Sequence, residues 1–329
     1  MSLAFEVLPG RVLARVFAHQ LESRRGPVPC LSYVTEGLRS SGQRELVFTI
    51  VRDAGATVDA APRGPLAFLR AVAELAAQGR LVGPGHWTEL GGAGLLGRAE
   101  LRGVAYQAAW PMDGVRLPEG ALAAIPLLAP ELETVKRFGA LRVLARLGRA
   151  AGFFPTAPWC DPDRAAIATP DEKTVLDGVA CGFFEGVSAV LDGAHVVVRI
   201  EPAASELIAR ALPGLPPTAA LALHLSLDPT ADACLVWSPG QTNLEAITPH
   251  GSAGARASGC FVLFVPEQDY DGGNPFEDGF AMMLTDASWA RLREALLSGA
   301  PLTIPGAANT KALCIETAPR SWRGAPSRA

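Results

Sequence analysis

The 329-residue chain is 49% hydrophobic and 19% charged, a composition that can bury a sizeable core and that excludes an intrinsically disordered protein. Its net charge of −4 does not provide the basic surface of a nucleic-acid-binding domain, so we expect no nucleic-acid partner. Only three of the 29 basic residues are lysines, which indicates a GC-rich, bacterial coding sequence. The length corresponds to roughly two domains of ~150 residues.

The amino terminus and the cysteines indicate a cytoplasmic protein. Met1–Val7 contains Glu6, whereas a secretory signal has a basic start and a long apolar run. No apolar stretch reaches the ~18 residues of a membrane-spanning helix, so we expect no membrane insertion. The six cysteines lie far apart without a Cys-x-x-Cys pair, and in that compartment we expect six free thiols.

The first half of the chain combines strands with one clear helix. Residues 30–35 and 44–51 are rich in β-branched and aromatic residues, which predicts two antiparallel strands joined by a turn with Gly37 and Gly42 at its ends. Apolar residues at helical spacing predict a helix over Pro65–Gln78. A strand is expected at 122–128. Residues 131–149 form either one helix or, because Gly139 interrupts the pattern, a short helix followed by a strand.

The second half is richer in strands and follows a proline-rich stretch. A hairpin is predicted at 187–200, turning at Asp192-Gly193, and a short helix follows at 203–212. Asp286 is positioned to N-cap a helix that runs to about Leu297. Further strands are predicted at 221–227, 234–237, 259–265, 280–284 and 311–316.

These elements predict an α+β fold, because strands neither alternate strictly with helices nor occur without them. We expect mixed or antiparallel sheets with flanking helices, arranged as two packed halves. The predicted organisation is an N-terminal α+β half (1–155), a proline-rich linker (156–175), a β-rich C-terminal half (176–318) and a disordered tail (319–329).

Two loops resemble ligand-binding motifs without completing them. Gly92, Gly94 and Gly97 match the Gly-x-Gly-x-x-Gly spacing of a dinucleotide loop, but the required strand before and helix after are not predicted, so a loop or hairpin connection is favoured. The acidic loop 267–278 begins like a calcium loop. Counted from Asp269, its sixth residue is Asn274 instead of Gly and its twelfth is Phe280 instead of Glu, so we expect a solvated connection.

No catalytic or metal-binding spacing is present. The five histidines are scattered, no His-Glu-x-x-His sequence occurs, and Gly-x-Ser-x-Gly is absent. We therefore expect no metal and no cofactor. Cys260 is either a buried packing residue or a nucleophile that needs a histidine such as His224 or His250 brought close by the fold.

Three blocks of the sequence resemble a known family. They are Leu31–Val47, Phe138–Pro155 and the region from Gly259 through Met283 to Leu296. Together they are similar to the uncharacterised C-terminal domain of the Smad-anchor (SARA) and endofin proteins, over about residues 30–305. The first block also resembles a segment of suppressor-of-fused-like domains. The chain has no paired cysteines for the zinc-binding FYVE finger of those proteins, so the resemblance does not imply endosome targeting. The Smad-binding segment of those proteins lies outside the similar region, so Smad binding is not implied either. It implies a domain of scaffold-type proteins.

The resulting hypothesis is a non-catalytic protein-interaction or scaffold module. Its protein partner is of unknown identity, and its oligomeric state is open. The alternative is a small-molecule-binding protein, or an enzyme whose site is assembled from scattered residues between the two halves. Because binding residues concentrate on connections and strand ends, the candidate partner-binding residues are Tyr33, Gln43, Arg44, Asp269, Asp271, Glu277 and Asp278.

Overall fold

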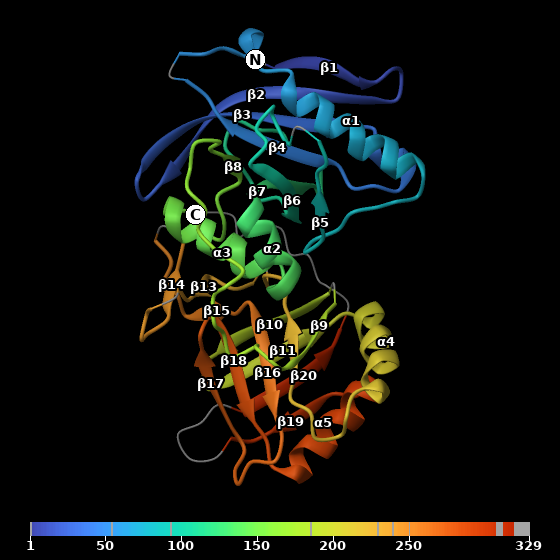
Figure 1. Cartoon of the computed structure of the whole chain (residues 1–329), viewed down its shortest axis with the longest axis vertical. Coiled ribbons are helices and arrows are strands. Elements are labelled where there is room, and N and C mark those ends of the chain that lie inside the picture. Colours follow the sequence, from blue (N-terminus) through green and yellow to red (C-terminus); the bar gives the residue numbers. More distant parts are fainter. Residues whose placement is uncertain are drawn as a thin grey trace. The chain divides into compact units, whose positions relative to one another are not determined.

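The computed structural model describes residues 2–53, 55–92, 94–184, 186–228, 230–238, 240–249, 251–306 and 312–318. Helices occur together with three sheets, all of them mixed, which confirms the α+β class. The chain forms two compact units, each described here by itself (Figure 1). Unit 1 comprises Met1–Ala140 and Ala157–Pro170, and unit 2 comprises Leu141–Thr156 and Asp171–Ala329.

Unit 1 is built on one eight-stranded sheet with the strand order β1-β2-β3-β4-β7-β6-β5, and β8 pairs with β4. The predicted strands 30–35 and 44–51 fall in β3 and β4, which pair antiparallel as expected. The long hairpin of β1 and β2 before them was not predicted. The strands are β1 (Ser2–Leu8), β2 (Val12–Ser23), β3 (Gly26–Glu36), β4 (Leu46–Val51), β5 (Trp87–Glu89), β6 (Leu101–Ala108), β7 (Leu122–Leu128) and β8 (Trp159–Cys160).

The two faces of this sheet are covered by different helices. The helix α1 (Gly64–Ala77) packs Phe68 and Leu69 against Tyr33 and Phe48 in the main apolar core (Figure 1). The helix α2 (Ala129–Phe138) lies at β6 and β7 on the other face, where Gly103 leaves room for the Leu132 side chain. The short 3-10 helices η1 (Leu38–Ser41) and η2 (Val58–Ala60) complete the unit.

Residues 131–149, expected to form one helix or a short helix followed by a strand, instead lie in two helices. Gly139, at φ 79° and ψ 160°, separates α2 from α3 (Ala140–Ala151). From Leu141 onward α3 belongs to unit 2, so the expected boundary at 155 lies beyond the point where the chain leaves unit 1. The expected linker 156–175 is also divided, because residues 157–170 return to unit 1 and supply β8.

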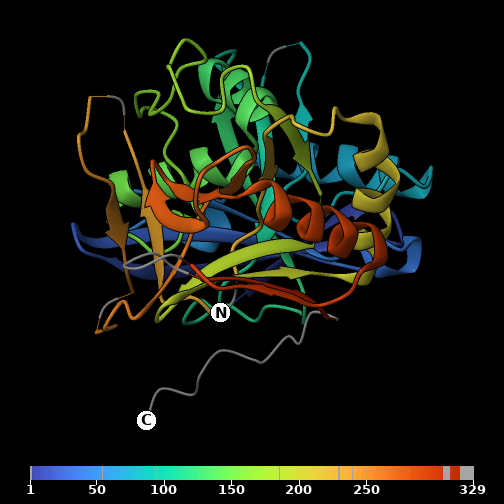
Figure 2. The same cartoon turned by 90° about the horizontal axis from the view of Figure 1, so that it is seen from below.

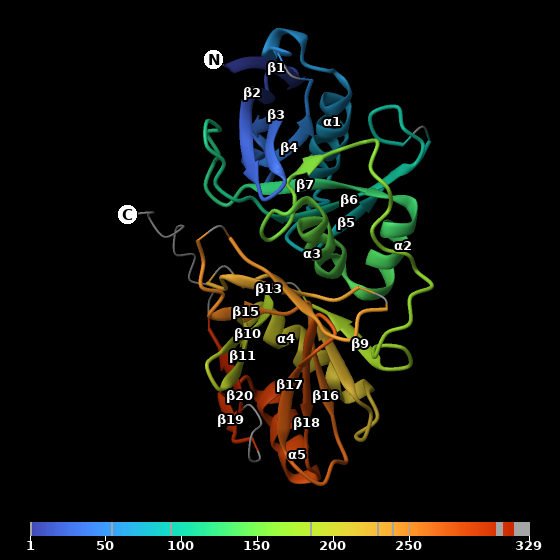
Figure 3. The ribbon, with the colours of Figure 1, turned by 90° about the vertical axis from the view of Figure 1, so that its left-hand side faces the viewer.

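Unit 2 contains two sheets. The seven-stranded sheet has the order β14-β13-β15-β10-β11-β20-β19, and the five-stranded sheet has the order β17-β18-β16-β12-β9. Labels in Figure 3 place β10, β11 and β20 beside β16, β17 and β18. The strands are β9 (Ala180–Phe183), β10 (Val187–Asp192), β11 (His195–Ile200), β12 (Leu221–His224), β13 (Ala233–Val236), β14 (Glu245–Ile247), β15 (Arg256–Ser258), β16 (Phe261–Val265), β17 (Gly272–Phe276), β18 (Gly279–Met283), β19 (Leu302–Ile304) and β20 (Ala312–Thr317).

The predicted hairpin at 187–200 is confirmed as β10 and β11. Helix α4 (Pro202–Ala211), followed by the 3-10 helix η3 (Leu212–Gly214), contacts helix α5 (Asp286–Ser298) (Figure 2). The N-cap of α5 is Thr285, whose side chain accepts a hydrogen bond from the Ser288 N–H, so the expected cap at Asp286 was one residue late. The predicted tail 319–329 lies outside the described residues.

Candidate functional site

The acidic loop lies at an edge of the five-stranded sheet in unit 2. Only residues 267–271 form a connection, whereas the whole of 267–278 was expected to be one. They lead into β17, an edge strand of the sheet, and β17 turns back into β18 through Glu277 and Asp278. Figure 3 shows this hairpin in unit 2. The seven-residue stretch from Tyr270 to Phe276 carries two of the exposed large apolar side chains, with 47% and 48% of these two residues exposed. This edge is therefore the best candidate for a binding surface among the predicted sites.

Two of the predicted binding residues, Glu277 and Asp278, make internal contacts that support this edge. Asp278 is fully buried and accepts hydrogen bonds from Nε of Arg142 at 3.0 Å and from Nη2 at 2.8 Å. Glu277 accepts from Arg142 Nη2 at 2.7 Å and from the backbone N–H of Val175 at 2.8 Å. The Thr174 hydroxyl donates to the same carboxylate at 2.7 Å. Glu277 and Asp278 thus hold the turn of the hairpin in place.

The Arg142 cluster is an internal ion-pair network. Burial lowers the pKa of Arg142, but the carboxylates of Asp278 and Glu277 outweigh that effect and raise it overall. A buried charge is tolerated only when it is paired and hydrogen-bonded, and here one guanidinium faces two carboxylates. Asp278 is completely enclosed, so it is not accessible to a partner.

Asp271 has a local structural role at the start of α5. Its Oδ1 accepts hydrogen bonds from the backbone N–H of Thr285 at 2.8 Å and from the Thr285 hydroxyl at 3.0 Å. Its Oδ2 accepts from the Ser288 hydroxyl at 2.6 Å. Asp271 therefore joins the acidic loop to the first turn of the helix, where a negative charge is favourable.

The exposed side chains of residues 267–278 form a surface that we call the acidic aromatic edge. It is defined as Glu267, Asp269, Tyr270, Asn274 and Phe276. All five residues are exposed. Neither Glu267 nor Asp269 forms a salt bridge with the described part of the chain. The edge thus combines unpaired negative charge with aromatic surface.

The predicted N-terminal site residues are mostly structural. Tyr33 is fully buried, and its hydroxyl donates to the Pro62 carbonyl oxygen at 2.7 Å. Gln43 is 1% exposed and exchanges hydrogen bonds with the backbone of Val82, which fixes residue 82 beside the turn after β3. Arg44 alone is exposed. The structure therefore does not gather these three residues into one accessible surface.

Glu45 organises the turn between β3 and β4. Its Oε1 accepts hydrogen bonds from the backbone N–H groups of Gly37 at 2.9 Å and Arg39 at 3.3 Å. The Thr35 hydroxyl donates to Oε2 at 2.6 Å and accepts from the Leu46 N–H at 2.8 Å. Within the first family-like block, this internal network accounts for the side chains of Thr35 and Glu45.

The glycine run connects β5 to β6, which pair antiparallel. This confirms the hairpin interpretation, because a dinucleotide loop leads from a strand into a helix. The calcium-like start of the acidic loop lies in the connection from β16 to β17. No group of three or more His, Cys, Asp or Glu side chains able to hold a metal occurs in the described ranges.

Cys260 is 2% exposed, and burial raises its pKa well above the ordinary value for a thiol. Its Sγ lies 3.9 Å from the carbonyl oxygen of Leu235. His224 pairs with Phe261 across β12 and β16, and His250 lies outside the described residues. Because the reactive form of a cysteine is the thiolate, this environment is typical of a packing residue.

A polar chain that sequence analysis missed crosses the sheet of unit 1. His19 Nε2 lies 2.8 Å from the Ser32 hydroxyl oxygen, which lies 2.7 Å from the Thr49 hydroxyl oxygen. Burial lowers the pKa of His19 to about 4, so the imidazole is neutral at pH 7. Ser32 is fully buried, and the three residues come from three neighbouring strands, a spacing that the sequence does not reveal.

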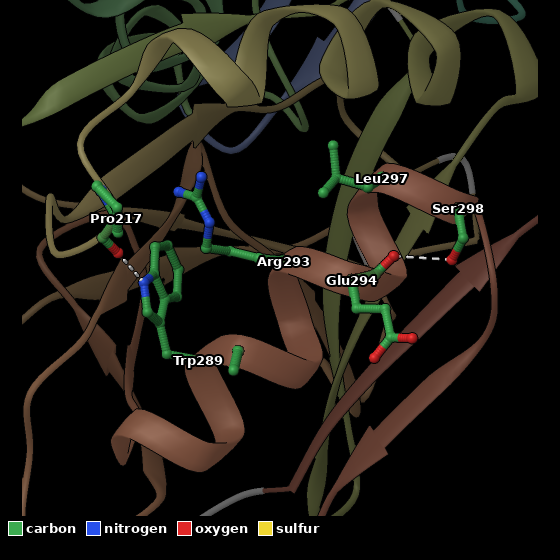
Figure 4. A pocket seen from close by; sticks show the side chains of 7 residues that line it. Pro217, Trp289, Arg293, Glu294, Leu297 and Ser298 are labelled. Carbon is green, nitrogen blue, oxygen red and sulfur yellow. Dashed lines mark hydrogen bonds between the residues drawn. The ribbon is translucent and has the colours of Figure 1, made fainter.

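A shallow groove of about 570 Å³ lies along α5 (Figure 4). Trp289 forms part of its floor, and the indole N–H donates to the Pro217 carbonyl oxygen. Arg293 lies 5.8 Å from the centre of that indole ring and donates to the Leu212 carbonyl oxygen. The groove is open, and these polar contacts stay within the chain, so its shape does not indicate a particular ligand.

No family model matches the chain, and no curated protein matches it. The resemblance to the SARA and endofin domain, and the weaker one to suppressor-of-fused-like domains, stay predictions. No helix in the described part of the chain is long and apolar enough to cross a membrane.

Proposed function

We propose that this chain is a protein-binding module whose binding surface is the acidic aromatic edge, and that its partner presents a basic segment. The supporting observation has three parts: two half-exposed aromatic rings, two carboxylates that form no salt bridge with the described residues, and buried ion pairs that hold the edge in place. Tyrosine and phenylalanine are enriched in protein interfaces, where they supply large contact areas. Unpaired carboxylates favour a positively charged partner.

The mode of binding follows from Pro275. Two residues connect β17 to β18, so Phe276 and Gly279 form the hydrogen-bonded pair that closes the hairpin. The next pair is Pro275 with Phe280, and in an antiparallel ladder it is not hydrogen-bonded. The backbone of Pro275 therefore faces away from β18. Proline has no N–H to donate at that position. An edge strand with proline there resists the addition of another strand. Partner recognition therefore uses the side chains of the edge and not its backbone.

The experiment compares affinity capture from native cell extract for three forms of the chain. The test variant is Asp269→Lys/Tyr270→Ala. The matched control is Glu206→Lys/Leu207→Ala, which changes an exposed acid and an exposed apolar residue on α4 of the same unit. The proposal is supported if wild type and the control variant capture the same partner and the test variant does not. The affinity of this partner should fall at least tenfold in the test variant and should weaken with added salt.

Equal retention by the test variant contradicts the proposal. Reproducible turnover that Cys260→Ala abolishes would instead favour the enzyme alternative.

A further inference from the structure

A small apolar pocket lies in unit 2 between β9 and β12 on one side and α4 with η3 on the other. Its volume is about 110 Å³, and every lining side chain is aliphatic or aromatic except the thiol of Cys181. The inner wall includes Leu212, Leu221 and Leu223, all nearly fully buried. Cys181 and Ala211 are exposed and lie at the mouth. The pocket is thus open to solvent at one end.

One wall depends on a glycine. The ring of Phe184 lies against β9 at Gly182, where an added Cβ would be 2.5 Å from the ring carbon Cε2. Any larger residue at 182 would displace the ring. The absence of a side chain at this position therefore gives the pocket its present shape.

The chemistry of the lining selects the occupant. A water molecule in a protein cavity needs two to four polar partners, and this lining offers little beyond one thiol. Burial raises the pKa of Cys181, so its thiol carries no charge at neutral pH and does not attract an ionic ligand. An apolar group gains free energy roughly in proportion to the area that it removes from water.

We propose that this pocket is a binding site for the short alkyl chain of a small amphiphilic molecule, with the polar end of the molecule outside the mouth. A cavity of ~150 Å³ accepts the six carbons of a benzene ring, so this pocket of about 110 Å³ accommodates a chain of about four carbons. The site is separate from the acidic aromatic edge and does not depend on the proposed protein partner.

The test uses pentan-1-ol as the probe and pentane-1,5-diol as its polar counterpart. Titration is followed by the methyl resonances of Ile208, Leu212 and Leu223. Pentan-1-ol should shift them saturably, and the diol should bind at least tenfold more weakly because its second hydroxyl would enter an apolar pocket. Bound pentan-1-ol should also slow alkylation of Cys181 with the same concentration dependence.

Two variants and a control make the result decisive. Ala211→Leu and Cys181→Leu each place a larger side chain at the mouth from opposite walls, and each should abolish saturable binding. Ala203→Leu changes an exposed alanine on the same helix that does not line the pocket, and it should bind like wild type. Non-saturable shifts in wild type, unchanged binding in either folded mouth variant, or equal affinity for the diol would overturn the proposal.

Discussion

Gly37 and Gly42 lie at the two ends of the turn after β3, and they differ in the space around their Cα atoms. Both have positive φ, at 113° and 78°, but a Cβ at Gly37 would also clash with the backbone carbonyl oxygen of Arg11. We expect Gly37→Ala to lower the free energy of unfolding by about 3 kcal/mol and Gly42→Ala by about 1 kcal/mol. Urea denaturation of both variants checks the order, and equal losses would contradict the clash.

His19 predicts a pH dependence of unit 1. Its pKa is about 4 in the folded chain and about 6.5 when unfolded, so acid protonates the unfolded state first. Stability should therefore fall as the pH drops from about 6.5 to about 4, by about 2 kcal/mol between pH 7.5 and pH 5. Hydrogen exchange of β2 and β3 at the two pH values measures this. His19→Gln should remove the dependence, whereas the exposed His195→Gln should retain it.

At the scale of single elements, Asp271 links the acidic loop to α5. Asp271→Ala removes the acceptor for Thr285 and Ser288 and should cost about 1–2 kcal/mol of unfolding free energy. The neighbouring exposed residue provides the control, because Asp269→Ala should change stability by less than about 0.5 kcal/mol. Thermal or urea denaturation distinguishes the two. A stability loss of the same size for Asp269→Ala would show that the contacts of Asp271 with Thr285 and Ser288 make no special contribution.

Local sequence patterns predicted single helices and strands better than they predicted which strands pair with one another. Pro65–Gln78 was recognised as a helix because its apolar residues repeat at helical spacing, and α1 matches it within one residue at each end. The pairing of β3 with β4 followed from two β-rich runs flanking a glycine turn. In contrast, the β1–β2 hairpin was missed, since β2 mixes Val12 and Val16 with alanine and arginine at core and half-buried positions.

The candidate site was predicted only in part, because burial of charge depends on distant residues. Exposed Asp269 is located where the sequence suggested, but Glu277 and Asp278 face Arg142, which lies 135 and 136 residues away. An arginine in a helical pattern is normally expected on the solvent side. Nothing in the local sequence of α3 or β17 shows that these charges meet in the interior.

At the scale of the whole molecule, α3 determines where the chain can be divided. Its Arg142, Arg146 and Arg149 pair with Asp278, Glu172 and Glu245, all in unit 2. A fragment 171–329 leaves buried carboxylates without their arginine, a defect that typically costs 3–5 kcal/mol. We therefore expect fragment 141–329 to be soluble with a cooperative urea transition and fragment 171–329 to aggregate or to unfold at much lower urea. Equal behaviour of the two fragments would contradict this role of α3.

The same arrangement constrains synthesis on the ribosome. Arg142 is made 136 residues before Asp278, its main partner. At translation rates of about 5–20 residues per second, α3 waits on the order of ten seconds for that carboxylate. During this interval Arg142 has neither of its carboxylate partners, Glu277 and Asp278. Unit 2 cannot be completed until nearly the whole chain has been made, so a stalled or truncated product would present this helix to chaperones and proteases.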